Sequence, residues 1–287
     1  MAADVVTGIG ALRALLAPLR QRGKTIALVP TMGALHAGHA RLIERARIDC
    51  DCVVVSIFVN PLQFDRKDDL DRYPRALDAD LALCTSRGVD FAFAPTAAEM
   101  YPKAPVCTVD PGRVAEHCCG RYRPRHFTGV ATVVLKLLDI VQPDVAYFGE
   151  KDAQQLAVIR RLVSDFNVPV TVIGVPTVRE ADGLALSSRN RHLSPAERRL
   201  APSLYDALTD AASHVAAGMT DAEDVKRHAA TRIPTDERVR LEYLEVVDPD
   251  DFQPVERIAG PVVIAGAMWV GGTRLIDNVR SSPRTTS

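Results

Sequence analysis

The chain has 287 residues, of which 47% are hydrophobic and 25% are charged, an ordinary composition for a globular protein. Domains usually have about 100–200 residues, so this length predicts one large domain or two unequal ones. The 35 basic and 36 acidic residues give a formal net charge of -1. Such a balance excludes the strong field typical of proteins that bind nucleic acid or anionic membranes, and we expect neither as a partner.

The first residues, MAADVVTG, lack a basic segment followed by an apolar core, and no apolar run approaches the roughly 18 residues of a spanning helix. These features predict a cytoplasmic protein. The six cysteines have C-x-C and C-C spacings instead of the C-x-x-C pairs typical of zinc sites. We therefore expect free thiols and no metal site built from protein ligands. A redox or metal site at Cys118 and Cys119 beside His117 is the alternative.

Helical and strand patterns alternate over the first 180 residues. Leucines at helical spacing predict a helix over 8–22, and a β-rich run closed by Pro30 predicts a strand over 25–29. A helix is expected from about 38 to 49, and the continuous apolar run at 53–59 is typical of a strand buried on both faces. Further helices are expected at 70–87, 126–141 and 152–166, and further strands at 90–94, 144–148 and 170–175.

This alternation predicts an α/β fold with a Rossmann-like, doubly wound parallel sheet over residues 1–180. The pattern then changes, because Ser194, Pro195 and Glu197 form a capping signal that predicts a helix of about 20 residues. Asp221 is expected to cap another helix. Strand-like runs follow at 241–247, 262–270 and 273–277. These elements predict a smaller C-terminal α+β domain over residues 181–287, with an antiparallel sheet.

The segment 30–39, PTMGALHAGH, lies between the strand at 25–29 and the helix that follows it. Parallel sheets bind ligands at the carboxyl ends of their strands, and the N–H groups of a helix start attract phosphate. His36 and His39 are three residues apart, so one helical turn can present both on the same side. Gly38 lets the backbone approach a ligand closely. Two imidazoles there suit a phosphate that gains charge in a transition state, although a solvated helix start is the alternative.

The H-x-G-H pattern resembles the signature of the nucleotidylyltransferase superfamily, and PTMGALHAGH is similar to the corresponding segment of the pantothenate synthetase (pantoate–β-alanine ligase) family. Further strings agree in the same order along nearly the whole chain: VVVSIFVNPLQF at 53–64, RHFTGVATVVLKL at 125–137, FGEKDAQQL at 148–156, DGLALSSRN at 182–190 and LIDN at 275–278. The chain departs from the commonest pattern of this family at Ala37, Ala153 and Leu186. None of these departures removes a charged or hydrogen-bonding group from the expected site.

The resemblance implies an ATP-dependent acid–amine ligase that uses Mg²⁺. In this reaction the carboxylate of pantoate attacks the α-phosphate of ATP, giving a pantoyl adenylate and pyrophosphate. The amine of β-alanine then attacks the acyl carbon and releases AMP, leaving pantothenate. The resemblance also implies a small C-terminal domain that covers the site, and a cytoplasmic homodimer.

The same resemblance implies the site residues. His39, as proton donor, His36 and Lys151 would be catalytic. ATP would be bound by Met32, Gly33, Ala34, Leu35, His36, Ala37, Gly38, His39, Gly149, Glu150, Lys151, Asp152, Val178, Leu186, Ser187, Ser188 and Arg189. Pantoate would be bound by Gln63 and Gln155.

Two other functions remain as alternatives. One is a cytidylyl- or adenylyltransferase that couples a nucleotide to a phosphorylated alcohol, and the other is a catalytically silent nucleotide-binding protein. A phosphorylated substrate would favour additional bases near Gln63 and Gln155, which argues against the transferase. The combined presence of the histidines, Lys151 and Arg189 argues against a silent protein.

Overall fold

The computed structural model describes residues 3–283 and divides into two compact units. The first unit contains the chain up to Pro111, together with Arg123–Glu150 and Val158–Pro176. The second contains Gly112–Tyr122, Lys151–Ala157 and the chain from Thr177 onward. Two short segments that precede residue 180 in the sequence are thus grouped with the C-terminal part, which the hydrophobic pattern does not indicate.

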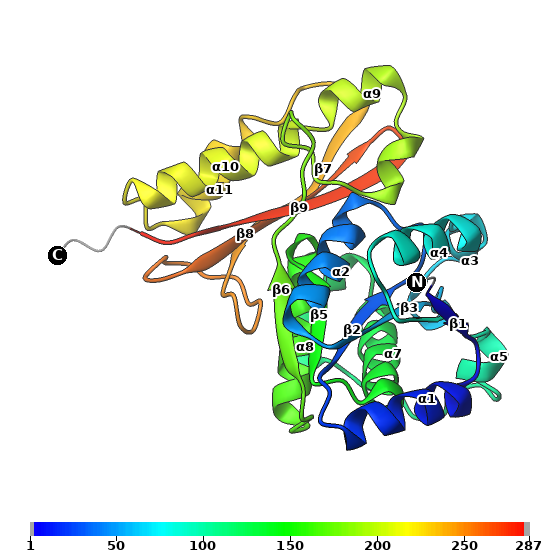
Figure 1. Ribbon diagram of the computed structural model, residues 1–287. Helices are drawn as coiled ribbons and strands as arrows, with labels where there is room; N and C mark the ends of the chain where they lie inside the picture. Colours follow the sequence, from blue (N-terminus) through cyan, green and yellow to red (C-terminus); the bar gives the residue numbers. More distant parts are fainter. Residues whose placement is uncertain (1–2, 284–287) are drawn as a thin grey trace. The chain divides into compact units, whose positions relative to one another are not determined.

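The first unit is built on a parallel sheet of six strands in the order β1-β4-β3-β2-β5-β6 (Figure 1). The strands are β1 (Asp4–Val6), β2 (Ile26–Thr31), β3 (Cys52–Ile57), β4 (Phe91–Phe93), β5 (Val145–Gly149) and β6 (Thr171–Val175). This confirms the doubly wound α/β class. The short strand β1, which pairs with β4 at the edge of the sheet, was not expected from the sequence.

The helices that belong wholly or partly to the first unit are α1 (Ile9–Gln21), α2 (Ala37–Asp49), α3 (Lys67–Arg72), α4 (Leu77–Ser86), α5 (Ala97–Met100), α7 (His126–Val141) and α8 (Ala153–Asp165), with short 3-10 turns η1 (Pro61–Gln63) and η3 (Glu150–Asp152). The end of η3 and the start of α8 are grouped with the second unit. On one face of β2, Ala27 and Val29 pack with Leu42 and Ile43 of α2. Alternate residues of a strand face opposite sides, so the buried Ile26 and Leu28 point to the other face, where α7 contacts β2. Both faces of the central strand are therefore covered, as its continuous apolar run predicts.

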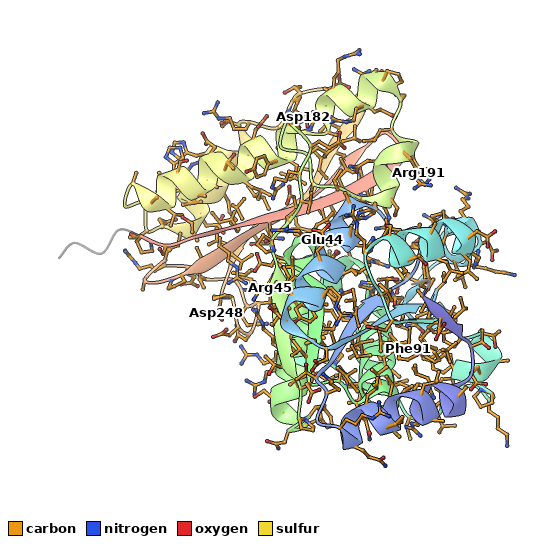
Figure 2. The ribbon with its side chains drawn as sticks, viewed as in Figure 1. Glu44, Arg45, Phe91, Asp182, Arg191 and Asp248 are labelled. Carbon is orange, nitrogen blue, oxygen red and sulfur yellow. The ribbon has the colours of Figure 1, made fainter. Side chains whose placement is uncertain are left out.

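Charged side chains occupy the solvent face of α2 (Figure 2). Arg45 forms an ion pair with Asp49 one turn later, and Glu44 pairs with Arg41 and Arg87. Exposed pairs of this kind contribute only about 0–1 kcal/mol each. The apolar face of α2, rather than these pairs, fixes the helix on the sheet and so fixes the position of the histidines at its start.

The second unit contains a three-stranded antiparallel sheet in the order β7-β8-β9. Its strands are β7 (Val239–Val247), β8 (Val262–Val270) and β9 (Thr273–Ser281). Its helices are α6 (Cys118–Tyr122), α9 (Pro195–Leu200), α10 (Ser203–Ala216) and α11 (Ala222–Ala230), with 3-10 turns η2 (Gly112–Ala115) and η4 (Ser188–His192). The antiparallel α+β arrangement expected for the C-terminal part is confirmed.

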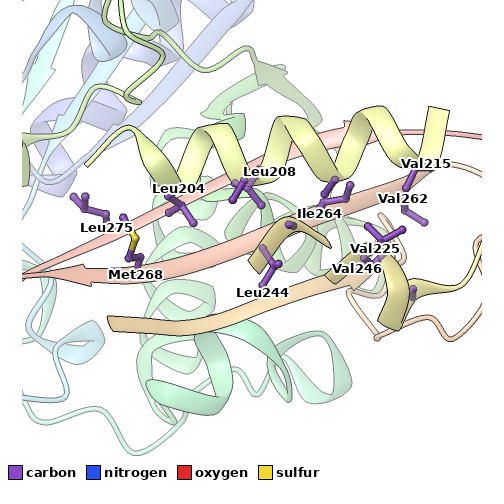
Figure 3. Packing of buried hydrophobic residues seen from close by; sticks show 14 of the residues in the cluster. Leu204, Leu208, Val215, Val225, Leu244, Val246, Val262, Ile264, Met268 and Leu275 are labelled. Carbon is purple, nitrogen blue, oxygen red and sulfur yellow. The ribbon is translucent and has the colours of Figure 1, made fainter. Parts of the chain in front are cut away.

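One hydrophobic core holds α10 and α11 on this sheet. Leu204 and Leu208 of α10 point toward β8, where Ile264 and Met268 complete the cluster (Figure 3). Gly266 of β8 is needed at the point of closest approach, because a Cβ there would lie 2.8 Å from Leu204 Cδ1. The core thus gives β9, which pairs along its whole length with β8, a rigid support.

Two predicted helices are each divided in the structure. The helix expected at 70–87 consists of α3 and α4, because Pro74 interrupts the hydrogen-bond ladder between them. The helix expected from Ser194 begins as predicted, with reciprocal hydrogen bonds between Ser194 and Glu197, but Pro202 separates α9 from α10. Asp221 caps α11 as expected, accepting hydrogen bonds from the backbone N–H groups of Glu223 and Asp224.

Within residues 3–283, no helix is long and apolar enough to cross a membrane.

Candidate active site

The predicted phosphate-binding segment lies where the strand order of the parallel sheet reverses. The chain runs from β2 through β3 to β4 on one side, and β5 pairs with the other side of β2. Open α/β sheets bind ligands at the carboxyl ends of their strands at such a reversal. Residues 32–39 follow β2, and Gly149 ends β5 on the adjacent strand. The strand ends therefore bring these two predicted ATP-binding segments to one edge of the first unit.

His36 and His39 form a reciprocal cap at the start of α2. Gly38 N–H donates to His36 Nδ1 at 3.1 Å, and His36 N–H donates to His39 Nδ1 at 3.2 Å. The ring centroids are 4.2 Å apart, which confirms that one turn presents both imidazoles together. Each Nδ1 carries a lone pair in this arrangement, so the proton of each neutral ring is on Nε2. The cap therefore makes Nε2 of both rings a hydrogen-bond donor.

The glycine of the H-x-G-H pattern has a packing role in the structure. A Cβ at Gly38 would lie 2.9 Å from Cε1 and 3.0 Å from Nδ1 of His36. A larger residue would push the His36 ring away from the helix start and break the cap. At Gly149, by contrast, a Cβ would meet no described atom within 4 Å. Internal packing does not require a glycine there, which agrees with the open backbone expected beside a nucleotide.

A buried carboxylate that sequence reasoning missed holds the turn before the histidines. Asp80 of α4 is 2% exposed and accepts hydrogen bonds from Ala34 N–H at 3.0 Å and Leu35 N–H at 2.7 Å. The turn needs this support, because Gly33 and Ala34 both have positive φ angles, of 80° and 51°. Asp80 and Cys84 are one turn apart and both buried. A carboxylate on the buried face of a helix is the signal that could have identified it.

We expect Asp80→Asn to destabilise the protein and to weaken ATP use. An amide can accept from one of the two N–H groups but presents a donor to the other. The loss of one buried hydrogen bond to a charged group costs about 1–3 kcal/mol in free energy of unfolding. Urea unfolding and the KM for ATP measure the two effects. Asp78→Asn, on the exposed side of the same helix, is the matched control. Equal behaviour of the two variants would contradict a positioning role for Asp80.

Gln63 is buried, and its amide orientation is fixed by neighbours in the first unit. Asn60 Nδ2 donates to Gln63 Oε1 at 3.1 Å and to Gly129 O at 3.0 Å. Asn60 Oδ1 accepts from Leu62 N–H and from the Tyr101 hydroxyl. These four hydrogen bonds fix the orientation of the Asn60 amide. Gln63 Oε1 is therefore the acceptor of its side chain, and Nε2 is the donor. Asn60, which is not among the site residues that the resemblance implies, thus contacts a predicted substrate-binding residue directly.

Glu150 follows Gly149 in the first unit, and the second unit contains the remaining predicted residues. Lys151 and Asp152 lie in η3, and Gln155 lies in the first turn of α8. The adjacent glutamine is structural, because Gln154 is 5% exposed and donates to Val114 O at 2.9 Å and to His117 O at 2.8 Å. Gln155 is half-buried and remains a candidate for binding a substrate.

A short hairpin joins Val178 to the predicted ATP-binding residues 186–189. Leu186 N–H donates to Val178 O at 2.9 Å, and Arg179 and Ala185 form a bridge. Ser187 caps η4 by accepting from Arg189 N–H, and Arg191 follows in the same turn (Figure 2). The hairpin thus places Val178 and Leu186 side by side, and it holds Ser187, Ser188 and Arg189 at its end.

Two half-buried cations of the second unit have no carboxylate partner among residues 3–283. Within the described part of the chain, Lys151 and Arg189 form no ion pair, although nearby Arg179 and Arg198 do. A half-buried cation without a carboxylate is available to an anionic ligand, and phosphate satisfies both lysine and arginine. This property is what the predicted role of Lys151 and Arg189 requires.

Five of the six thiols are buried. All six cysteines are free, and Cys107 alone of the six is exposed. Burial raises the pKa of the Cys52 thiol to about 12 and that of Cys84 to about 11, with smaller contributions from nearby carboxylates. Burial likewise raises the pKa of Cys118. Residues 3–283 contain no group of three or more histidine, cysteine or acidic side chains arranged to hold a metal ion. The alternative of a metal site at Cys118 and Cys119 therefore finds no support in these residues.

The parallel sheet and the paired histidines at its strand reversal define an α/β fold of the nucleotidylyltransferase type. A family model described as pantoate-beta-alanine ligase matches residues 4–280. The chain belongs to this family.

Three similar proteins illustrate the relationship. A bifunctional pantoate ligase/cytidylate kinase from Thermosynechococcus vestitus is 56% identical over 257 residues, covering 88% of this chain and 50% of that protein. The crystal structure of pantothenate synthetase from Thermus thermophilus has a TM-score of 0.91 and 44% identity, covering 98% of this chain and 100% of that one. A pantoate-beta-alanine ligase from Francisella tularensis, complexed with beta-gamma ATP and β-alanine, has a TM-score of 0.80 and 34% identity, with 97% of each chain covered. The chain spans about half the length of the bifunctional relatives that it matches.

Proposed function

We propose that this protein condenses pantoate with β-alanine at the expense of ATP, through a pantoyl adenylate, and releases AMP and pyrophosphate. The observation that carries the proposal is the histidine cap at the strand reversal, with a donor Nε2 on each ring. Family membership supports the substrates, since the similar ligase from Francisella tularensis is complexed with beta-gamma ATP and β-alanine.

The residues that the resemblance implies are proposed to bind ATP. Met32 to His39 would line the phosphates and Gly149 and Glu150 the nucleotide, with Asp152 accepting a ribose hydroxyl. Val178 would contact the adenine, and Leu186 to Arg189 would bind the β- and γ-phosphates. His39, with His36, would donate hydrogen bonds to phosphate oxygens as negative charge grows during displacement of pyrophosphate. Lys151 would neutralise the same charge.

Pantoate is proposed to be bound by Gln63 and Gln155 in place of an arginine. The orientation of Gln63 supports this, because its Oε1 accepts from Asn60 and its Nε2 donates to Met32 Sδ, a weak acceptor that a substrate oxygen can replace. A neutral donor can orient a carboxylate without the strong ground-state stabilisation of a bidentate arginine pair. The carboxylate oxygen then attacks the α-phosphorus, and pyrophosphate leaves. In the second step the amine nitrogen of β-alanine attacks the acyl carbon, loses a proton, and AMP leaves.

Mg²⁺ is proposed as the metal ion of the reaction. The described residues offer no cage of three or more protein ligands. Mg²⁺ does not require such a cage, because it is usually held by substrate phosphates, waters and one or two carboxylates. When bound, the ion would neutralise phosphate charge. A cytoplasmic homodimer is the assembly and location that the resemblance implies, and we propose both for this protein.

Isotope exchange between pyrophosphate and ATP tests the proposed reaction. We expect exchange that requires pantoate and Mg²⁺ and does not require β-alanine, because the adenylate step is reversible and precedes the amine. Exchange that requires a phosphorylated alcohol instead of pantoate would favour a nucleotidylyltransferase. Binding of ATP with no exchange under any condition would favour a silent nucleotide-binding protein, and either result would overturn the proposal.

A further inference from the structure

A buried polar network in the second unit connects β9 to the predicted phosphate-binding residues. Arg179 makes a bidentate ion pair with Asp277, with N–O distances of 2.6 and 2.9 Å. Both side chains are mostly buried, at 19% and 5% exposed. Arg179 also donates to Gly183 O at 3.0 Å, and its guanidinium carbon lies 3.8 Å from the centroid of the Tyr205 ring. The hairpin that carries residues 186–189 is therefore fixed to β9 at its base.

The next residue of β9 extends this network to Lys151. Asn278 is 9% exposed, and its Nδ2 donates to Lys151 O at 3.0 Å. Its own N–H donates to Asp277 Oδ1 at 2.8 Å, and its carbonyl accepts from Arg179. One dipeptide at the centre of β9 thus holds the backbone of Lys151 on one side and the 179–185 hairpin on the other.

The chemistry proposed for this unit depends on the distance between Lys151 and Arg189. Lys151 and Arg189 are cations on separate segments that would bind the phosphates of a single nucleotide, and neither forms an ion pair within residues 3–283. Their separation must therefore match the spacing of the phosphates. The hydrogen bonds of Arg179, Asp277 and Asn278 connect the two segments through a strand that the α10–β8 core makes rigid.

We propose that Arg179, Asp277 and Asn278 are positioning residues for the adenylate-forming step, with Asn278 acting through Lys151. This inference rests on the proposed function. It gives a role to the LIDN segment, which sequence reasoning used only as a point of resemblance. The inference also predicts that a disturbed network slows one half-reaction more than the other. Pyrophosphate has left before β-alanine reacts, so a misplaced Lys151 slows the first half-reaction far more than the second.

Asn278→Ala tests the inference, because it removes the hydrogen bond to Lys151 while leaving the Arg179–Asp277 ion pair in place. Ser281→Ala is the matched control. Ser281 lies on the same strand and donates to Ala212 O at 2.9 Å, so this change also removes one side-chain-to-backbone hydrogen bond. We expect Asn278→Ala to slow single-turnover adenylate formation about tenfold or more, since small displacements of binding groups have large effects on rate. The reaction of preformed pantoyl adenylate with β-alanine should stay within about threefold of wild type, and Ser281→Ala should leave both rates unchanged.

A double-mutant cycle separates positioning from general destabilisation. In a Lys151→Ala background, Asn278→Ala should cause little additional loss of adenylate formation, because the group it positions is absent. Equal losses in both half-reactions, additive losses in the cycle, or a Ser281→Ala variant as slow as Asn278→Ala would each overturn the inference. If Asn278→Ala does not fold, Asn278→Asp gives the same comparison, since it keeps the shape but cannot donate to the Lys151 carbonyl. A wild-type enzyme without pantoate-dependent exchange would refute the proposed function instead.

Discussion

Replacing His39 with alanine should reduce the rate of adenylate formation about a hundredfold to a thousandfold. The imidazole is placed by its cap so that Nε2 is a donor, and a donor that acts mainly in the transition state contributes roughly 3–4 kcal/mol. Because the interaction strengthens as charge develops on the phosphate, the loss should appear in the rate constant at saturating ATP and pantoate. Rapid-quench measurement of pyrophosphate release gives that constant.

Two conservative variants separate catalysis from helix capping at the same position. His39→Asn keeps an acceptor near the position of Nδ1, so the hydrogen bond from His36 N–H can survive, but it has no group at the position of Nε2. His39→Gln can place an amide N–H near Nε2. We expect His39→Asn to unfold at the same temperature as wild type and yet to be as slow as His39→Ala. His39→Gln should recover part of the rate. A fast His39→Asn enzyme would show that the cap, and not Nε2, is what the reaction needs.

The helices and strands that were predicted most accurately are those with the strongest local sequence patterns. The helix at 126–141 and the strand at 262–270 were predicted with their observed ends, because long apolar patterns of one period leave little ambiguity. The predicted helices at 70–87 and after Ser194 each contain a proline, and in both cases the structure breaks the helix there. The edge strand Asp4–Val6 is too short for its three residues to give a pattern.

The candidate site was predicted from local motifs and from the family resemblance, whereas its supporting residues were not. The spacing of His36 and His39 after a strand indicates a phosphate site, and the resemblance adds Lys151 and Arg189. Asp80 and Asn278 act through contacts with backbone groups of residues 45 and 127 positions away in the sequence. The position of Asp80 on the buried face of its helix indicates that the carboxylate has a partner. No local pattern shows which backbone groups Asp80 or Asn278 binds, because only the fold brings those groups to them.

Replacing Lys151 with alanine should slow adenylate formation about a hundredfold, with a much smaller effect on the reaction of preformed pantoyl adenylate with β-alanine. The half-buried ammonium forms no ion pair in the described part of the chain, so its charge is available to the phosphates that leave in the first step. The second step produces AMP from an adenylate that has already lost pyrophosphate, and it has less charge to neutralise.

The comparison of half-reactions makes this prediction sharper than a loss of overall activity. Lys103→Ala, which removes an exposed lysine, controls for the change in net charge and should leave both rates unaltered. Lys151→Arg keeps the charge but replaces a compact ammonium with a larger planar group, so we expect it to recover only part of the first rate. Because Asn278 holds the carbonyl and not the side chain of Lys151, Lys151→Ala should leave the network of β9 intact and the unfolding temperature near that of wild type. Equal slowing of both half-reactions in a stable Lys151→Ala protein would mean that the lysine also contacts the acyl group or β-alanine, and that phosphate neutralisation is only part of its role.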